Sequence, residues 1–374
     1  MKKIQLAYIV STLGRTGPTR QLLNILRHLD RNQFEPHLIT LSNNPRDNLE
    51  GEFLALGIEV YPLNLSRLTT SLLGGRRLAD LCERLRPDLL HTQGLRADWL
   101  SARNRGIRSR VSTQRNDPYI DYPSLMGQWS GRMAAYLHQH ALDRIPVLVT
   151  CSNAISQNYS RSDRTVRIIH NGVELSKPNP HLGWPERAAK RRKLHLPEHA
   201  DLFVFAGPLI PRKRPGFLIK AFRGLKDGSR GLVILGDGPL MKECRALSQN
   251  LPNIFLLGQM PAIDDYLQIA DCFISASVSE GLPNAVLEAL SANVPALLSD
   301  IPAHREVLGY SSLAGWLFPT NCPHSLARTI SSLKIEDENR KAARQLVCDH
   351  FDAVEMSRAY QKLYLEQVAA SSKA

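Results

Sequence analysis

Ser279-Glu280-Gly281-Leu282-Pro283-Asn284-Ala285-Val286-Leu287-Glu288 places two carboxylates eight residues apart around a Gly-x-Pro turn. The preceding run, residues 271–275, is apolar and β-branched and predicts a buried strand. Because proline is tolerated in a first helical turn, the next helix is expected to begin near Pro283. Glu280 then lies in the loop, and Glu288 lies about one and a half turns into the helix.

A strand, a glycine-containing loop and a helix N-terminus offer backbone N–H groups to an anionic ligand. A carboxylate in such a loop repels phosphate, but it accepts hydrogen bonds from hydroxyl groups. Two carboxylates beside an anion-binding helix end therefore indicate a ligand that has both phosphates and sugar hydroxyls. A nucleotide sugar has this chemistry.

Four other motifs accompany this stretch, in order along the chain. They are Asp88-Leu89-Leu90-His91, Ile168-Ile169-His170-Asn171-Gly172-Val173, Phe205-Ala206-Gly207-Pro208-Leu209-Ile210-Pro211-Arg212-Lys213 and Leu232-Val233-Ile234-Leu235-Gly236-Asp237-Gly238-Pro239. With the Glu-x7-Glu pair, they resemble the motifs of the retaining glycosyltransferases of family 4, which have the GT-B fold. The resemblance spans residues 4–320 and implies a bacterial polysaccharide- or lipopolysaccharide-type enzyme.

The resemblance implies roles for individual residues. Glu280 corresponds to the residue near the transferred sugar, Glu288 to the glutamate that binds the ribose hydroxyls, and Lys213 to the diphosphate-binding lysine. Pro208 replaces the family's partner arginine, so Arg212 or Arg214 is expected to reach in instead. The remaining candidates for donor binding are Gly207, Arg212, Arg214, Gly281, Leu282 and Asn284.

The first half departs further from the family. Gln114 or Arg115 stands where many members have a histidine. Arg115, beside Asp117, is expected to have one of two roles. It binds an acidic or pyrophosphate-bearing acceptor, or it forms an ordinary surface ion pair with Asp117. Gly14 and Gly17 either let the backbone approach a phosphate or acceptor, or simply form a tight turn. A retaining mechanism in which the leaving phosphate takes the acceptor proton needs no side-chain base.

Strand and helix patterns alternate in two series. The expected strands are 4–10, 37–41, 58–62, 89–91, 108–113, 147–150 and 166–169, then 202–206, 232–235, 254–257, 272–275, 296–298 and 314–318. This alternation predicts an α/β protein with two doubly wound, Rossmann-like parallel sheets, and the GT-B resemblance implies that they face each other across a cleft. The expected domains are residues 1–180, for the acceptor, and residues 190–350, for the donor.

Three other segments complete this organisation. The Pro-rich stretch 177–185 reads as a linker. The basic run 190–193 is interpreted as a solvated helix face. A last helix, at 353–370, is expected from the resemblance to pack on the first domain.

Composition limits the compartment and the partners. The 374 residues suit two domains, and the six scattered cysteines without C-x-x-C favour a reducing, cytoplasmic location. Residues 4–10 resemble a first strand more than a signal peptide, and no window is apolar enough to span a membrane. No zinc-finger, helix-turn-helix or RNA-binding signature is present, so nucleic acid is not an expected partner.

The charge is uneven: residues 1–180 carry a net +9 and residues 181–374 a net +3. The basic excess gathers at Arg76, Arg77, Arg84, Arg86, Arg96, Arg103, Arg105, Arg108 and Arg110. An aromatic and methionine-rich stretch follows at Tyr119, Tyr122, Met126, Trp129, Met133 and Tyr136. Both features are consistent with peripheral contact with an anionic membrane and a lipid-linked acceptor. The alternative for the basic residues is that they form solvated helix faces. The alternative for the aromatic and methionine-rich stretch is a core helix under a loop.

No D-x-D pair or histidine/cysteine cluster with ligand spacing occurs, so neither a metal nor another cofactor is expected. The sequence thus predicts a metal-independent hexosyltransferase that uses a nucleotide sugar and a glycan or lipid-linked acceptor. A nucleotide-sugar epimerase of the same fold and a catalytically lapsed binding protein remain alternatives. An NAD-dependent oxidoreductase is disfavoured because no G-x-G-x-x-G follows the first strand.

Overall fold

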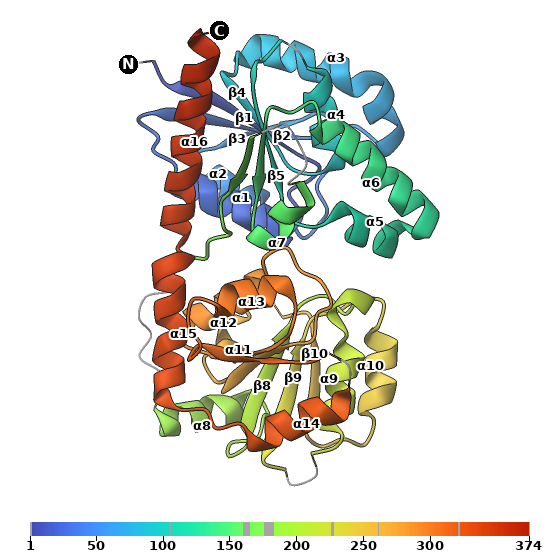
Figure 1. Cartoon of the computed structure of the whole chain (residues 1–374), viewed down its shortest axis with the longest axis vertical. Helices are drawn as coiled ribbons and strands as arrows, with labels where there is room; N and C mark the ends of the chain where they lie inside the picture. Colours follow the sequence, from blue (N-terminus) through green and yellow to red (C-terminus); the bar gives the residue numbers. More distant parts are fainter. Residues whose placement is uncertain are drawn as a thin grey trace. The chain divides into compact units, whose positions relative to one another are not determined.

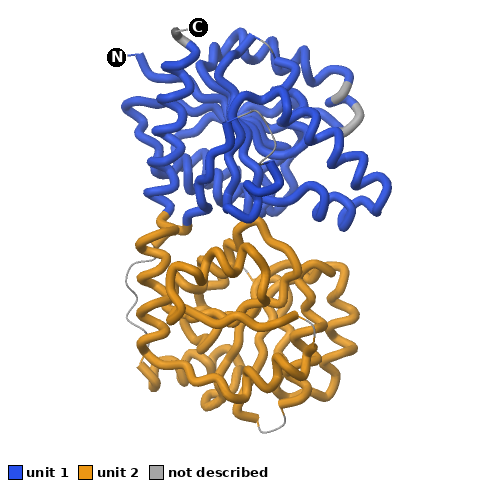
Figure 2. Tube along the Cα trace, in the orientation of Figure 1, with its two compact units in different colours: residues 1–172, 353–374 blue, residues 173–352 orange. Residues whose placement is uncertain are grey.

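The computed structural model describes residues 2–104, 106–159, 165–175, 183–225, 228–260, 262–320 and 322–373. It contains two compact units, shown in Figure 2: unit 1 is Met1–Gly172 with Ala353–Ala374, and unit 2 is Val173–Asp352. Most of the expected linker and Arg105 lie outside the described residues. Each unit is built around its own parallel sheet.

Unit 1 has a seven-stranded sheet in the order β3-β2-β1-β4-β5-β6-β7, and all its pairings are parallel. The strands are β1 (Ile4–Val10), β2 (Phe34–Thr40), β3 (Glu59–Pro62), β4 (Leu89–Thr92), β5 (Ser109–Gln114), β6 (Val147–Thr150) and β7 (Thr165–Ile168). The strand order reverses between β1 and β4. Ligands of doubly wound sheets bind beyond the carboxyl ends of the strands at such a reversal.

Helices cover both faces of this sheet (Figure 1). The helices of unit 1 are α1 (Gly17–Arg27), α2 (Glu50–Ala55), α3 (Arg67–Leu85), α4 (Leu95–Arg103), α5 (Pro118–Met126), α6 (Gln128–Leu142), α7 (Asn153–Ser156), the 3₁₀ turn η1 (Gln157–Tyr159) and α16 (Ala353–Lys373). The Thr16 hydroxyl accepts from the backbone N–H of Thr19 and so caps α1.

The last helix, α16, belongs to unit 1 and packs beside α1. Its Tyr360 and Tyr364 are fully buried. The Tyr364 hydroxyl lies 2.8 Å from Nδ1 of His91 on β4, and Nε2 of the same ring lies 2.8 Å from Oγ1 of Thr113 on β5. Burial, together with the charge of Arg115, lowers the pKa of His91 to about 3, so this ring is neutral at pH 7.

Helices α5 and α6 form a hairpin that projects from the rest of unit 1 (Figure 1). A Cβ at Gly131 would lie 2.3 Å from the backbone nitrogen of Pro123, so only glycine allows this close approach. The hairpin leaves Leu125 and Trp129 73% and 88% exposed. Most of the aromatic and methionine-rich stretch is thus exposed, and its interpretation as a core helix is wrong for all its members except Tyr122.

Unit 2 has a six-stranded sheet in the order β10-β9-β8-β11-β12-β13, again parallel throughout. The strands are β8 (Asp201–Ala206), β9 (Arg230–Leu235), β10 (Ile254–Gly258), β11 (Cys272–Ser275), β12 (Ala296–Ser299) and β13 (Gly315–Phe318). The helices are α8 (Trp184–Lys193), α9 (Pro215–Phe222), α10 (Met241–Ser248), α11 (Asp264–Leu267), α12 (Asn284–Ser291), α13 (Pro302–Leu308), α14 (Pro323–Ser332) and α15 (Asp337–His350), with the 3₁₀ turn η2 (Pro211–Lys213).

One expectation for α8 is wrong. The run 190–193 is not simply a solvated face, because Arg191 is fully buried. Its Nη2 donates to Oδ2 of Asp271 at 2.6 Å, and Asp271 also pairs with Arg187 and Arg340. Three arginines thus surround one buried carboxylate at the start of β11. The face of α8 that was expected to be solvated therefore contributes a side chain to the interior of unit 2.

The predicted α/β class with two doubly wound sheets is confirmed, and all the expected strands are present with ends that differ by a few residues. Helix α12 begins at Asn284, with Pro283 as its N-cap residue. Within the described ranges, no helix combines the length and apolar character needed to cross a membrane.

Candidate active site

The loop that follows β11 carries the first glutamate of the Glu-x7-Glu stretch. Oε1 of Glu280 lies 2.6 Å from Nζ of Lys213, and Oε2 lies 2.7 Å from Nη1 of Arg212. The Glu280 side chain is only 7% exposed. Burial alone would raise the pKa of this carboxyl, but the charges of Lys213 and Arg212 outweigh it and lower the pKa to about 2. Glu280 is therefore ionised, and the cluster of three carries a net positive charge.

The two cations reach Glu280 because β8 and β11 are neighbours in the sheet. Both strands run in the same direction, so the loops at their carboxyl ends meet. The backbone N–H of Val278 donates to the carbonyl of Arg212 at 3.0 Å, and Nη1 of Arg212 donates to the carbonyl of Ser279 at 2.7 Å. Backbone and side chain together hold the two loops in one place.

Gly207 lies where the loop after β8 meets the loop after β9. The backbone φ is +151° at Gly207 and +141° at Gly236, a region that favours glycine. A Cβ at Gly236 would lie 1.9 Å from the carbonyl oxygen of Gly207. The glycines therefore allow the two backbones to touch, and this contact positions the turn that carries Lys213.

Of the two arginines predicted to bind the donor, one lies at Glu280 and the other does not. Arg212 joins the cluster, whereas Arg214 donates to the carbonyl of Thr320 at 2.9 Å and lies 4.4 Å above the ring of Phe217. Gly281 and Leu282 are buried, while Asn284 and Glu288 are half-buried in α12. Glu288 lies on the second turn of this helix.

His304 on α13 is a residue that the sequence reasoning missed. It is fully buried, and its Nδ1 donates to the carbonyl of Ser299 at 2.8 Å, while Nε2 has no hydrogen-bond partner. Burial lowers its pKa to about 4; the charge of Glu280 acts in the opposite direction, and that of Lys213 lowers the pKa further. His304 is thus a neutral neighbour of the charged cluster. A lone histidine in a short helix of mixed polarity gave no sequence signal.

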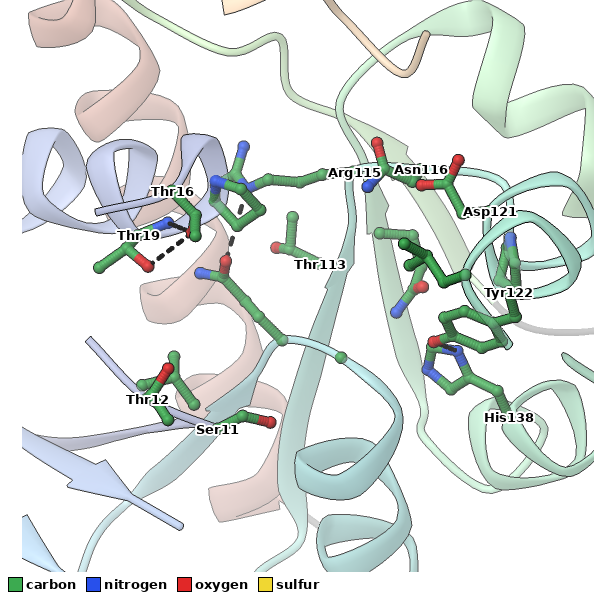
Figure 3. Close-up of a pocket in the computed structure, with 17 residues that line it drawn as sticks. Ser11, Thr12, Thr16, Thr19, Thr113, Arg115, Asn116, Asp121, Tyr122 and His138 are labelled. Carbon is green, nitrogen blue, oxygen red and sulfur yellow. Dashed lines mark hydrogen bonds between the residues drawn. The ribbon is translucent and has the colours of Figure 1, made fainter. Parts of the chain in front are cut away.

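Unit 1 has a separate cavity of about 300 Å³ at the carboxyl ends of β1, β4 and β5 (Figure 3). Its walls include Ser11, Thr12, Thr16, Thr19, Gln93, Thr113, Gln114, Arg115, Asn116, Asp121, Tyr122 and His138. Arg115 is part of this wall. Gly14 is buried, and a Cβ there would lie 3.1 Å from Pro45, while Gly17 opens α1 beside the cavity.

The two residues at the position of the family's histidine are both buried. Gln114 donates to Oδ2 of Asp98 at 3.1 Å. Arg115 makes no surface ion pair with Asp117, because it is buried and its guanidinium donates to Gln93 and Asn171. Oδ1 of Asp117 instead caps α5 at Tyr119, and its Oδ2 accepts from Asn158. The surface-pair interpretation of Arg115 is therefore wrong.

A buried network that the sequence did not reveal supports this wall. Oδ2 of Asp98, on α4, lies 2.7 Å from Nε2 of His138, and Nδ1 of His138 lies 2.8 Å from the hydroxyl of Tyr122. Burial, followed by the charge of Asp98, raises the pKa of Tyr122. The network fixes the Tyr122 ring between α5 and α6 as a neutral phenol at the cavity. Its members lie far apart in sequence, without a motif to link them.

No group of three or more His, Cys, Asp or Glu side chains converges as a metal-binding set in the part of the chain that the structure describes. The unit 2 cluster offers cations and loop backbone to an anion, with the Glu280 carboxylate beside them for hydroxyl groups. Unit 1 offers a polar cavity with a buried guanidinium. The first arrangement suits a phosphate-bearing sugar donor.

Family models and relatives agree with this chemistry. The model "Glycosyltransferase Family 4" matches residues 15–177, and "Glycosyl transferases group 1" matches residues 186–346. The UDP-Gal:alpha-D-GlcNAc-diphosphoundecaprenol alpha-1,3-galactosyltransferase of Escherichia coli is 24% identical, and the match covers 98% of each chain. An uncharacterized glycosyltransferase of Methanocaldococcus jannaschii is 29% identical over 52% of this chain and 49% of its own length.

Solved structures share the fold. Sucrose-phosphate synthase from Thermosynechococcus elongatus has a TM-score of 0.80 at 17% identity, and the match covers 98% of this chain and 100% of that one. HepE from Anabaena in complex with UDP has a TM-score of 0.78 at 16% identity, with the same coverage. The two family models together span most of both units, and the chain belongs to the glycosyltransferases of the GT-B type.

Proposed function

We propose that this protein transfers a sugar from a nucleoside-diphosphate sugar to a cell-surface glycan or lipid-linked acceptor, with retention of anomeric configuration and without a metal. The observation that carries the proposal is the buried Glu280 carboxylate held between Lys213 and Arg212. One carboxylate and two cations leave a positive site at the carboxyl edge of a doubly wound sheet, where a diphosphate binds.

Each group has a distinct part in the proposed reaction. Lys213 and Arg212 stabilise the diphosphate as the bond between the anomeric carbon and the phosphate oxygen breaks. Glu280 orients the sugar hydroxyls and stabilises positive charge at the anomeric carbon. The acceptor oxygen bonds to that carbon on the same face, and its proton passes to the leaving phosphate. Glu288 accepts from the ribose hydroxyls, and the backbone of Gly281, Leu282 and Asn284 completes the donor site.

The comparisons support the substrate classes. The Escherichia coli relative is named for a diphosphoundecaprenol acceptor, as is an N-acetylgalactosaminyltransferase of Campylobacter jejuni that is 28% identical over 54% of this chain. HepE was solved with UDP and with UDP-glucose. A uridine nucleotide sugar and a polyprenyl-linked acceptor are therefore the first substrates to test.

The decisive experiment is a thermal-shift screen of nucleotide sugars, followed by hydrolysis and transfer assays with the best binders. We expect one nucleotide sugar to raise the melting temperature and to be hydrolysed slowly by water. Its transfer to a polyprenyl-linked saccharide should give a product of retained configuration by NMR. Stabilisation without turnover would favour a lapsed binding protein, and an epimerised free nucleotide sugar would favour an epimerase.

Glu288→Ala should weaken the binding of free nucleoside diphosphate, whereas Glu280→Gln should not. Glu288→Ala removes a charged acceptor from the ribose and should raise the Kd about 10- to 100-fold. Glu280→Gln removes a negative charge next to Lys213 and Arg212, so the diphosphate should bind equally well or more tightly while turnover falls. Isothermal titration calorimetry distinguishes the two effects. An equal loss of affinity in both variants would contradict these separate roles.

The exposed hairpin formed by α5 and α6 should contact lipid. Replacing both Leu125 and Trp129 by serine removes two largely exposed apolar side chains, and partition onto anionic phosphatidylglycerol vesicles should fall at least about 10-fold. High salt should also release the wild-type protein, because it screens the basic surface of unit 1. Leu72→Ser is the matched control, since Leu72 is 82% exposed on a different helix, α3. Equal co-sedimentation of the wild type, the double variant and Leu72→Ser with vesicles would show that the hairpin is an ordinary solvated surface.

A further inference from the structure

Arg115 is a buried cation whose hydrogen-bonding capacity is only partly used. It follows β5, is 8% exposed, and forms part of the cavity wall. Nη1 donates to Oδ1 of Asn171, and Nε donates to Oε1 of Gln93 at 3.4 Å. Nη2 is buried and has no hydrogen-bond partner. Figure 3 shows the side chain reaching across the cavity toward Thr16.

The surroundings of this guanidinium are neutral. Asn171 and Gln93 are amides, and His91 is kept neutral by burial. The phenol of Tyr360 also interacts with Arg115, but it is neutral because burial raises its pKa more than Arg115 lowers it. No carboxylate among the described residues lies within ion-pairing distance of Arg115. An arginine cannot shed its proton in a protein, so this charge persists in a site of low dielectric constant. A buried charge of this kind is costly unless an opposite charge accompanies it.

The same wall of the cavity carries further hydrogen-bond donors. The hydroxyl groups of Thr12, Thr16 and Thr19 lie on the side toward which Arg115 extends (Figure 3). Those of Thr16 and Thr19 are 2.9 Å apart and bond to each other, which leaves one of their two protons for a ligand. The N-terminus of the 11-residue helix α1 also lies there, without an acidic residue in its first turn. The carboxylate on the cavity wall, Asp121, lies on the opposite side in Figure 3. The charge distribution thus favours an anion at one end of the cavity.

We propose that this end of the cavity binds a phosphate or diphosphate group of the acceptor, with Nη2 of Arg115 as its main anchor. Phosphate fits better than carboxylate because its several oxygens can accept from the guanidinium and from the threonine hydroxyls together. The inference rests on the proposed function and adds the chemical class of the acceptor. It also gives a role to Arg115, one of the two residues that stand where many family members have a histidine.

The test is calorimetric titration with inorganic pyrophosphate at constant ionic strength. Four full-length proteins are compared: wild type, Arg115→Met, Lys213→Ala and Arg110→Met. We expect Arg115→Met to raise the Kd of the unit 1 site about 10- to 100-fold, because a charge-assisted hydrogen bond is lost. Lys213→Ala should bind pyrophosphate at the unit 1 site with the same Kd as the wild type. Arg110→Met, the matched control, removes a charge from the same strand outside the cavity and should bind like the wild type.

Several outcomes would overturn the inference. These are identical titrations of wild type and Arg115→Met, complete loss of pyrophosphate binding in Lys213→Ala, or tighter binding of glucuronate than of pyrophosphate. The second outcome would assign the anion to the donor site, and the third would make the ligand a carboxylate. Pyrophosphate binding at Arg115 without any binding of a nucleotide sugar would contradict the proposed sugar transfer but would leave the anion site at Arg115 supported.

A measurement on the wild-type protein covers the case in which Arg115→Met does not fold. Crystals soaked in pyrophosphate should show a phosphate group within hydrogen-bond distance of Nη2 of Arg115. Arg115→Lys provides a milder variant, which keeps the charge but loses the planar fork, and it should bind with intermediate affinity. Phosphate density at Lys213 and Arg212 alone would contradict the inference.

Discussion

Lys213→Ala is expected to reduce turnover about 100- to 1,000-fold, the cost typical of losing one group that stabilises charge in a transition state. Nζ of Lys213 lies 2.6 Å from Glu280 in a largely buried site, where its charge is weakly screened. A leaving diphosphate gains negative charge as its bond to the sugar breaks, and Lys213 is placed to stabilise it. Hydrolysis and transfer of the donor, measured under saturating conditions, give the effect on turnover.

The same assay tests independence from metal. If Lys213 and Arg212 supply the positive charge, activity should survive excess chelator. Lys220→Ala is the matched control, because this lysine is exposed on the neighbouring helix α9 and should leave turnover unchanged. Restoration of a chelator-treated enzyme by magnesium or manganese, or a Lys213→Ala variant within a few-fold of wild type, would refute the proposed role.

Much of this site could be predicted because its information is local. Strands buried on both faces of a parallel sheet read as continuous apolar runs, as residues 232–235 do, so the order of elements followed from the sequence. The Glu280 loop and α12 form one contiguous segment. Lys213 is 67 residues away, yet it meets Glu280 because β8 pairs with β11. A motif at the carboxyl end of each strand was enough to bring both residues to one edge.

The remaining features depend on contacts that no local pattern records. Asp98 and His138 are 40 residues apart on two helices, and neither belongs to a periodic signal. Arg115 reads as a polar loop residue, and only the surrounding strands show that it is buried. Long side chains give the weakest signal, because the same arginine can lie in solvent or reach inward to a carboxylate.

Arg191 is the clearest example of this ambiguity, and its partner gives the largest expected effect on stability. Asp271→Ala should lower the free energy of unfolding of unit 2 by about 3–5 kcal/mol, the cost of leaving buried charges without a counter-ion. Three guanidinium groups, those of Arg187, Arg191 and Arg340, would lose their shared carboxylate. The backbone N–H of Leu202 would also lose its acceptor at 2.8 Å.

Urea unfolding monitored by tryptophan fluorescence measures this loss: Trp184 on α8 and Trp316 on β13 report on unit 2, and Trp99 and Trp129 report on unit 1. The matched control is Asp265→Ala. Its carboxylate is 54% exposed and pairs with Lys190 at 2.7 Å, so the loss should be at most about 1 kcal/mol. Equal effects of the two substitutions would show that the buried cluster contributes no more than a surface pair.

The pH dependence separates a charge effect from a simple packing defect. Burial would raise the pKa of Asp271, but Arg187 and Arg191 outweigh it, and the pKa is lowered in the folded protein. A carboxyl with a lowered folded pKa contributes stability above its unfolded pKa of about 3.9, and that contribution is lost as the pH falls through the folded value. The difference between wild type and Asp271→Ala should therefore stay constant from about pH 5 to 8 and shrink below about pH 4. A difference that persists unchanged in acid would mean that Asp271 stabilises unit 2 by its packing and not by its charge.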